Sequence, residues 1–423
     1  MPSVPRLPIV GDPLRRVHVR RDLASITTTA AEVDPVEVGA DSKAVDKMWR
    51  AARDLYRSGV HPALQLCVRR HGEVVIDRAI GHARGNGPDD DRDAEKVLVT
   101  PDTPFCVFSA SKAMTAMVVH KLHERGLLDI EARVAEYIPE YAANGKEDTT
   151  IAHVLAHRAG VPTLPRSLLS VEHLSDSEHI MEVICAAKPM VKPGTLLAYH
   201  AVSGGSILGE IVRRVTGRDI RAVLASEFLD PLGFRWMNYG VAEADVGEVG
   251  LNYVTGPRTL PPLSTLITRV LGNPIDAVVD MSNDPRFLTA VVPAANIVTN
   301  AAELSRFFEI FRAGGELDGV RVMEPETIVQ AVTEQSRLEI DLSLGFPTRF
   351  SLGLMLGAKV LSPYGRDTDQ AFGHLGLINI MGWADPERAL SAALITSGKP
   401  VLYPELPRFF GVMQTVTSEV PKR

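Results

Sequence analysis

Apolar residues near the start of the chain recur first at helical spacing and then at strand spacing. In "SKAVDKMWRAARDLY", residues 42–56, the apolar side chains share one helical face behind a capping Ser or Asp: Val45, Met48, Trp49, Ala52 and Leu55. The next segment, "ALQLCVRRHGEVVIDRAIG", contains two extended apolar runs on either side of His71-Gly72. The pattern therefore predicts a helix over 42–56 and then a β-hairpin that turns at His71-Gly72.

The rest of the chain continues with helical and later with extended patterns. The segment "AMTAMVVHKLHERGLL", which begins at residue 113, is apolar nearly all round, as is typical of a helix buried within a protein, and Gly126 ends it. Between about 140 and 290 the clearest helices are "SEHIMEVICAA" and "GGSILGEIVRRVTG". Past residue 290 the pattern predicts strands in "RFSLGLML", "LINIMGWAD" and "ALSAALITS", followed by a last helix at about 404–417.

The order of these elements predicts one sheet assembled from both ends of the chain. We expect an α/β (α+β) fold in which an antiparallel sheet, flanked by helices, is formed by residues 42–140 and 291–423. A mainly helical domain at 141–290 would be inserted between these two parts. Residues 1–41 are rich in Pro, Thr and charge, so they are expected to form an N-terminal extension.

Composition and charge narrow the classes of function. Hydrophobic residues make up 45% of the 423 residues and charged residues 23%, as in ordinary globular proteins. The net charge of -7 disfavours a general binder of nucleic acid or of anionic membranes, because neutralising phosphates requires clustered Lys and Arg. The basic run "RRVHVRR" at 15–21 falls in the N-terminal extension and is interpreted as a solvated tail.

Cysteine usage and the lack of long apolar runs indicate the compartment. Cys67, Cys106 and Cys185 are odd in number and have apolar neighbours, which favours buried free thiols over disulfides. No run approaches the roughly 18 apolar residues of a membrane span. No export signal is evident near the N-terminus. The sequence therefore predicts a cytoplasmic protein without stable membrane insertion.

The stretch "FSASKAM", residues 108–114, carries candidate chemistry. Ser109 and Lys112 are three residues apart at the start of a helix, so their side chains share a face, whereas Ser111 and Lys112 diverge. Ser109 would then have a base one turn away and a free backbone N–H as an oxyanion donor. Lowering the pKa of Lys112 to neutrality costs roughly 4–5 kcal/mol, which burial can supply. The motif alone leaves a capping serine beside a surface lysine as the alternative.

Further segments extend this motif into an ordered series. Tyr199 follows a Pro-Gly turn in "KPGTLLAYHAVSGGS", and "AFGHLGLINIMGWAD" places His374-Leu375-Gly376 at the start of a predicted strand. The runs "IAHVLAHRAGVP" and "FLDPLGF" complete the series. Over roughly residues 45–420 it resembles the serine β-lactamase-like hydrolases, which include class C β-lactamases, relatives of penicillin-binding proteins and family VIII carboxylesterases.

The resemblance implies a role for each matching residue. Ser109 matches the acylated nucleophile and Lys112 the base beside it. Tyr199 matches the tyrosine of the Y-x-N motif, whose pKa a neighbouring ammonium would lower, so that the two groups would titrate as a coupled pair. His374-Leu375-Gly376 matches the K-T-G strand, and by that match the backbone N–H groups of Ser109 and Leu377 would form the oxyanion hole. No metal ion and no organic cofactor is implied.

Departures from the family pattern favour esters over β-lactams. Ala201 replaces the Asn of Y-x-N, His374 replaces the Lys of K-T-G, and the S-D-N motif is absent. A neutral imidazole holds a carboxylate less well than an ammonium does, and a cytoplasmic location suits a β-lactamase poorly. The resemblance therefore implies a carboxylesterase or lipase-like serine hydrolase that cleaves small to medium acyl esters through an acyl-enzyme on Ser109.

Alternative functions share this scaffold. They are an acyltransferase that uses the same acyl-enzyme, a weak β-lactamase or D-peptidase, and a non-catalytic binding protein. A binding protein has no need for a serine beside a deprotonated lysine, so Ser109, Lys112 and Tyr199 together argue against it. The expected partner is a small-molecule ester rather than a nucleic acid, and assembly into a homo-oligomer is compatible with the sequence.

Three other features have two interpretations each. His153 and His157 are four residues apart, as zinc ligands can be, but Val154 stands where H-E-x-x-H has Glu, so no metal site is expected. The apolar, proline-punctuated segment 257–290 is interpreted as part of a substrate pocket wall, with plain core as the alternative. Trp383 would line the same cleft or pack in the core.

Overall fold

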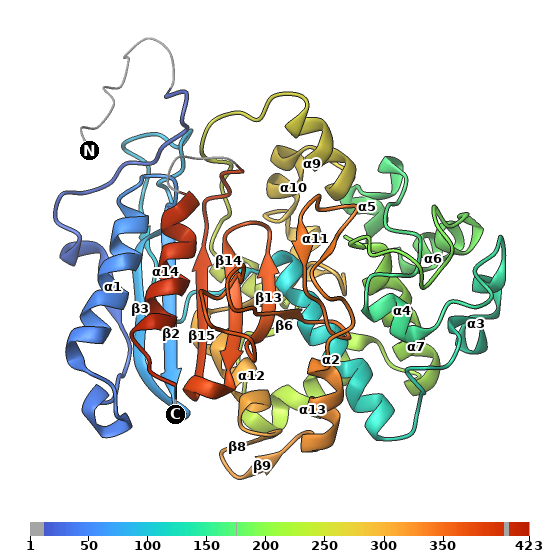
Figure 1. Cartoon of the computed structure of the whole chain (residues 1–423). Helices are drawn as coiled ribbons and strands as arrows, with labels where there is room; N and C mark the ends of the chain where they lie inside the picture. Colours follow the sequence, from blue (N-terminus) through green and yellow to red (C-terminus); the bar gives the residue numbers. More distant parts are fainter. Residues whose placement is uncertain (1–11, 175, 402–405, 423) are drawn as a thin grey trace.

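An antiparallel sheet forms the centre of the structure (Figure 1). The computed structural model describes residues 12–174, 176–401 and 406–422. The strands follow one another across the sheet in the order β1 (Thr27–Thr29), β3 (Glu73–Arg84), β2 (Ala63–Arg70), β15 (Leu390–Thr396), β14 (Ile380–Asp385), β13 (Phe372–Gly376) and β12 (Met355–Leu356), with β4 (Val97–Leu98) on β3. The order confirms the predicted antiparallel sheet, although its domain limits stay a prediction.

The two ends of the chain meet at the middle of this sheet. Strand β2 pairs with β15 over seven residues, from Leu64 opposite Thr396 to Arg70 opposite Leu390. Every residue of β15 is buried, which explains its nearly continuous apolar sequence. The β2–β3 hairpin turns at His71 and Gly72, both with positive φ, as the sequence predicted.

Helices cover both faces of the sheet (Figure 1). On one face α1 (Ser42–Tyr56) lies beside α14 (Leu406–Ser418), and α12 (Ala301–Arg312) and α2 (Ser111–Glu124) pack on the other. The predicted face of α1 is buried, and Asp41 caps the helix by accepting the Lys43 N–H at 2.9 Å. Helix α2 is buried on nearly all sides, as its uniformly apolar sequence predicted.

The middle of the chain supplies short helices beyond β13 (Figure 1). These are α3 (Val134–Tyr137), α4 (Ile151–Leu155), α5 (Val171–Leu174), α6 (Ser177–Ala186), α7 (Ser203–Thr216), α8 (Ile220–Leu224), α9 (Leu263–Leu271), α10 (Ile275–Met281) and α11 (Pro285–Thr289). A small sheet ties this region to the rest, because β6 (Asn238–Tyr239) and β5 (Phe105–Cys106) both pair with β7 (Ile297–Thr299). The remaining elements are β8 (Glu316–Leu317), β9 (Val320–Arg321), α13 (Pro325–Val332), β10 (Glu339–Ile340) and β11 (Pro347–Thr348).

Two predictions about irregular regions are wrong. His374-Leu375-Gly376 ends strand β13 rather than starting a strand, because Leu377 and Ile378, with φ of 22° and 71°, turn the chain before β14 begins. The basic run at 15–21 is not wholly a solvated tail. Val17 is buried and its N–H donates to the Gly59 carbonyl at 2.7 Å, since the N-terminal segment packs along the sheet and supplies β1.

Of the predicted strand "RFSLGLML" only Met355–Leu356 is a strand, β12. The three cysteines are free, as expected, although Cys185 is only half-buried.

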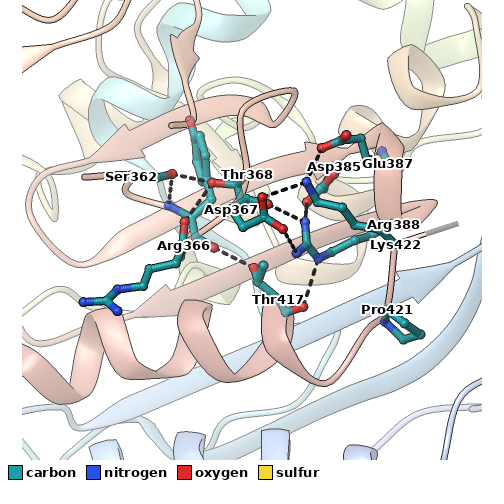
Figure 2. A network of polar contacts seen from close by, with 12 residues as sticks. Ser362, Arg366, Asp367, Thr368, Asp385, Glu387, Arg388, Thr417, Pro421 and Lys422 are labelled. Carbon is teal, nitrogen blue, oxygen red and sulfur yellow. Dashed lines mark hydrogen bonds and ion pairs between the residues drawn. The ribbon is translucent and has the colours of Figure 1, made fainter. Parts of the chain in front are cut away.

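A polar network joins the C-terminus to the β14–β15 turn (Figure 2). The Arg388 guanidinium donates to the Asp385 carboxylate at 2.8 Å, to the Asp367 carbonyl at 2.8 Å and to the Thr417 carbonyl at 3.0 Å. Lys422 pairs with Asp367 at 2.9 Å. Asp385 is fully buried, so Arg388 compensates a charge that has no access to water.

Candidate active site

The two serines of "FSASK" occupy different environments. Residues 108–110 form a 3-10 turn that leads directly into α2, and Phe108 holds a left-handed φ of 49° just before Ser109. Ser111 is fully buried, donates to the Phe108 carbonyl at 2.5 Å and accepts the Ile297 N–H at 2.9 Å. Ser111 therefore holds the turn in place, whereas Ser109 is partly exposed and contacts Lys112.

The Lys112 amine is surrounded by three oxygen atoms. Its Nζ lies 3.2 Å from Ser109 Oγ, 2.8 Å from the Ala201 carbonyl oxygen and 2.9 Å from the Ala294 carbonyl oxygen. Burial lowers the pKa of Lys112 to about 7. A neutral amine has two hydrogens and one lone pair. Because carbonyl oxygens only accept, they take the two hydrogens and leave the lone pair facing Ser109 Oγ.

Tyr199 completes the contacts of Ser109. Its hydroxyl hydrogen-bonds to Ser109, and Lys112 Nζ lies 5.0 Å from the centre of its ring. We expected the ammonium to lower the pKa of this phenol, and that expectation is wrong. Complete burial raises the pKa of Tyr199 above its ordinary value and outweighs the hydrogen bond between Tyr199 and Ser109. Lys112 is therefore the group of the two that titrates near neutral pH.

Asp341 holds the backbone on which Tyr199 stands. One oxygen of its fully buried carboxylate, Oδ1, accepts the N–H groups of Tyr199 at 3.0 Å, Ser343 at 2.8 Å and Leu344 at 2.9 Å. The chain offers no local signal for this contact, since Asp341 and Tyr199 are 142 residues apart. Sequence reasoning missed Asp341 for that reason.

Strand β13 borders the site, with the ring of its His374 6.5 Å from the ring of Tyr199. A Cβ atom on Gly376 would lie only 2.1 Å from the Val107 carbonyl oxygen, so the end of the strand approaches the backbone just before Ser109 as closely as glycine allows. Leu377, the second predicted oxyanion residue, follows directly and is partly exposed. The structure thus brings Ser109, Lys112, Tyr199, Gly376 and Leu377 to one place.

His374 presents a neutral imidazole beside this group. Its Nδ1 donates to the Leu375 carbonyl at 2.8 Å, because a carbonyl oxygen can only accept, so the neutral ring carries no hydrogen on Nε2. That Nε2 atom is buried and has no partner among the described residues. Burial, followed by the nearby Lys112, lowers the pKa of His374 to about 3.

The remaining candidate residues divide between pocket and core. A narrow pocket beside Ala201 and Val202 is lined by Leu164 and by residues 269–272 at the end of α9, which favours a pocket wall for that part of 257–290. Trp383 is fully buried and stacks on Tyr364, so it belongs to the core. His157 is buried with its ring 4.6 Å from that of Tyr199. The described residues contain no cluster of metal-ligating side chains.

Comparison with known proteins identifies the family of this chain. A family model described as Beta-lactamase matches residues 45–408. The chain belongs to the beta-lactamase family. Esterase/beta-lactamase LipL of Mycobacterium tuberculosis is 32% identical over 345 residues, which cover 78% of this chain and 76% of LipL.

Two solved structures superpose on most of the chain. A penicillin-binding protein homolog from Caulobacter crescentus has a TM-score of 0.76 at 25% identity, covering 90% of this chain and 99% of its own. A family VIII carboxylesterase has a TM-score of 0.74 at 26% identity, covering 89% and 99%. These matches confirm the expected β-lactamase-like fold and a β-lactamase-related serine hydrolase.

The comparisons do not test the predicted location, the oligomeric state or the roles of single site residues. In the described part of the chain no helix is both long enough and apolar enough to cross a membrane. A cytoplasmic location and a homo-oligomer both stay predictions. The roles of the individual site residues rest on the geometry above and are argued next.

Proposed function

We propose that this member of the beta-lactamase family is a carboxylesterase that forms an acyl-enzyme on Ser109. The observation that carries the proposal is the environment of Lys112, whose Nζ lies 3.2 Å from Ser109 Oγ with a pKa lowered to about 7. A buried lysine next to a partly exposed serine is costly for a structural role and useful for a general base.

Acylation would begin with the neutral Lys112 amine. Its lone pair accepts the Ser109 proton while Oγ bonds to the ester carbonyl carbon, whose π electrons move to the carbonyl oxygen. Tyr199 keeps its proton and donates to Oγ, which stabilises the charge that develops there. When the intermediate collapses, the C–O bond to the alcohol breaks and the alkoxide takes the proton from the Lys112 ammonium. Water repeats the sequence and releases the acid.

The oxyanion is assigned to two backbone N–H groups, those of Ser109 and Leu377. The close approach of Gly376 to the Val107 carbonyl supports this assignment, because it keeps the two segments beside each other. Backbone donors held in this way need no reorganisation when the charge develops.

The surroundings of Ser109 favour esters over β-lactams. His374 stands where relatives with K-T-G carry an ammonium, yet it is neutral and its only N–H is bound to the Leu375 carbonyl. It therefore offers no donor to the carboxylate of a β-lactam. Leu164 and Leu271 line a narrow pocket beside Ala201, so an apolar acyl group would contact them more favourably than a charged one.

Acyl transfer is the second candidate, because the same acyl-enzyme serves both reactions. A bound alcohol or amine would replace water in the second step. The two activities differ only in the product, so they are separated by adding an alcohol and measuring the ratio of new ester to free acid.

Release of p-nitrophenol from p-nitrophenyl butyrate tests the proposal. Wild type should hydrolyse the ester and should gain one phosphonyl group from a fluorophosphonate, detected by intact mass. Ser109→Ala should lose both properties. Ser418→Ala is the matched control, since Ser418 is exposed on α14 and makes no contact with the site. It should keep the label. Equal activity of wild type and Ser109→Ala would remove Ser109 from the mechanism.

A further inference from the structure

The loop between β13 and β14 has a backbone conformation that its residues disfavour. Residues 377–379 alone connect the two strands. Leu377 and Ile378 have φ of 22° and 71°, a region that glycine enters freely and that a β-branched residue such as Ile rarely adopts. The Asn379 N–H donates to the Leu377 carbonyl at 2.9 Å and closes a γ-turn over Ile378, in the strained form of that turn. Such strain persists only where the surrounding structure fixes it, and it is typical of functional sites.

Asn379 joins this loop to a segment at the end of β15. Its side chain is fully buried, and its Nδ2 atom donates to the Pro400 carbonyl at 3.2 Å. Its backbone carbonyl accepts the Thr396 hydroxyl at 2.7 Å. Both contacts are thus made with one short segment, residues 396–400, which we call the platform. Neither contact belongs to the ladder of the sheet, because β14 pairs with β15 only from Ile380 onwards.

The platform is itself fixed by the residues around it. The Ser397 N–H donates to the Ala63 carbonyl at 3.0 Å, and the Ser397 carbonyl accepts the Tyr253 N–H at 2.8 Å. A Cβ atom on Gly398 would lie only 1.8 Å from the Val60 carbonyl oxygen, so the chain passes that carbonyl as closely as glycine allows. Contacts with two separate segments therefore hold the platform in place, and it can hold the strained loop in turn.

The platform also contacts the segment that carries Ser109. Lys399 is buried, its Nζ donates to the Thr396 carbonyl, and the same atom lies 5.3 Å from the centre of the Phe108 ring. A lysine ammonium at that distance from an aromatic face is attracted to it. Phe108 directly precedes Ser109. The platform therefore contacts both segments that carry the proposed oxyanion donors, the one before Ser109 and the one that contains Leu377.

We propose that Asn379 is a positioning residue, which keeps the Leu377 N–H directed at the oxyanion by holding the strained loop on the platform. The inference rests on the proposed function, because it takes the N–H groups of Ser109 and Leu377 as the two oxyanion donors. Asn379 is fully buried, so it acts through Leu377 rather than by touching the ester. Backbone donors stabilise a developing charge best when they are held in place before the reaction, and a buried anchor supplies that.

Loss of the anchor should affect the transition state more than substrate binding. Without the contact to Pro400 the loop can relax towards negative φ, which turns the Leu377 N–H away from the oxyanion. Removing one oxyanion donor outright lowers kcat by about 100- to 1000-fold. The strand ladder remains and limits the movement, so we expect Asn379→Ala to lower kcat by about 30-fold. The KM should change by less than about twofold, since the oxyanion is absent from the bound ester.

Hydrolysis of p-nitrophenyl butyrate by the full-length protein, together with inhibition by a trifluoromethyl ketone, tests the inference. Ser109 Oγ bonds to the ketone carbon, Lys112 takes the Ser109 proton, and the ketone oxygen becomes the anion that the two donors bind. Asn379→Ala should therefore raise the inhibition constant by about the factor by which kcat falls. Thr396→Val removes the hydroxyl that donates to the Asn379 carbonyl, and it should lower kcat by about fivefold with the same effect on inhibition.

Thr417→Val is the matched control, because Thr417 is as buried as Thr396 and its hydroxyl donates to the Tyr364 carbonyl at 2.6 Å, away from the site. It should keep the kcat and the inhibition constant of wild type. Urea unfolding shows which variants are folded, and if Asn379→Ala is not, Thr396→Val decides.

A wild-type kcat in the folded variants would overturn the inference and leave the esterase intact. An equal rise of KM and inhibition constant at unchanged kcat would also overturn it, because the loop would then shape the cleft and not the oxyanion site. Failure of the proposed function is a separate result, namely equal activity of wild type and Ser109→Ala.

Discussion

The variant Gly376→Ala should move the two proposed oxyanion donors without changing any reacting side chain. The added Cβ would lie 2.1 Å from the Val107 carbonyl oxygen, whereas non-bonded carbon and oxygen atoms rarely come closer than about 3 Å. The end of β13 and the segment before Ser109 must therefore separate by about 1 Å. No reacting side chain changes, but a displacement of that size in a catalytic group costs roughly 100-fold in rate.

The assay is steady-state hydrolysis of p-nitrophenyl butyrate together with thermal unfolding. We expect kcat to fall by about 100-fold, because the two proposed oxyanion donors move apart. Gly411→Ala in α14 is the matched control: its Cβ would meet nothing within 4 Å, so activity should be unchanged and stability equal or higher. A Gly376→Ala protein that unfolds cooperatively and keeps the kcat of wild type would refute the reasoning.

Three further predictions concern protonation, positioning and stability. The kcat/KM for the ester should rise as pH increases through about 7, since only neutral Lys112 accepts a proton. A kcat/KM that stays constant between about pH 5.5 and 8.5 would contradict this. Asp341→Ala should lower kcat at least tenfold, because the Tyr199 N–H loses its partner. Asp341→Asn should retain activity, because the amide oxygen can accept the same N–H groups as Oδ1. Equal loss of kcat in both variants would argue against a role for Asp341 in positioning Tyr199. Arg388→Met should lower the free energy of unfolding by about 3–5 kcal/mol in urea titrations, since the buried Asp385 carboxylate loses its cation and keeps only the Glu387 N–H, and an unchanged midpoint would disprove that.

Local patterns predicted the elements whose residues all lie close together in the sequence. Helix α1 and the β2–β3 hairpin appear where expected because helical and strand periodicity are properties of a single segment. The errors arose where a distant segment decides the packing or where residues adopt an unusual backbone conformation. The packing of Val17 depends on Gly59, far away in the sequence. The turn after Gly376 is local, but Leu377 and Ile378 adopt positive φ there, which such residues rarely do, so the sequence gives no turn signal.

By itself the sequence determined that Ser109 and Lys112 would touch, because three residues of helical backbone place them on one face whatever surrounds them. The tertiary structure decided what that contact can do. Carbonyl groups 89 and 182 residues away orient the Lys112 lone pair, and burial lowers its pKa. The same burial keeps Tyr199 protonated, against the expectation from the motif. Desolvation depends on every segment packed around a group, so only the complete fold sets it.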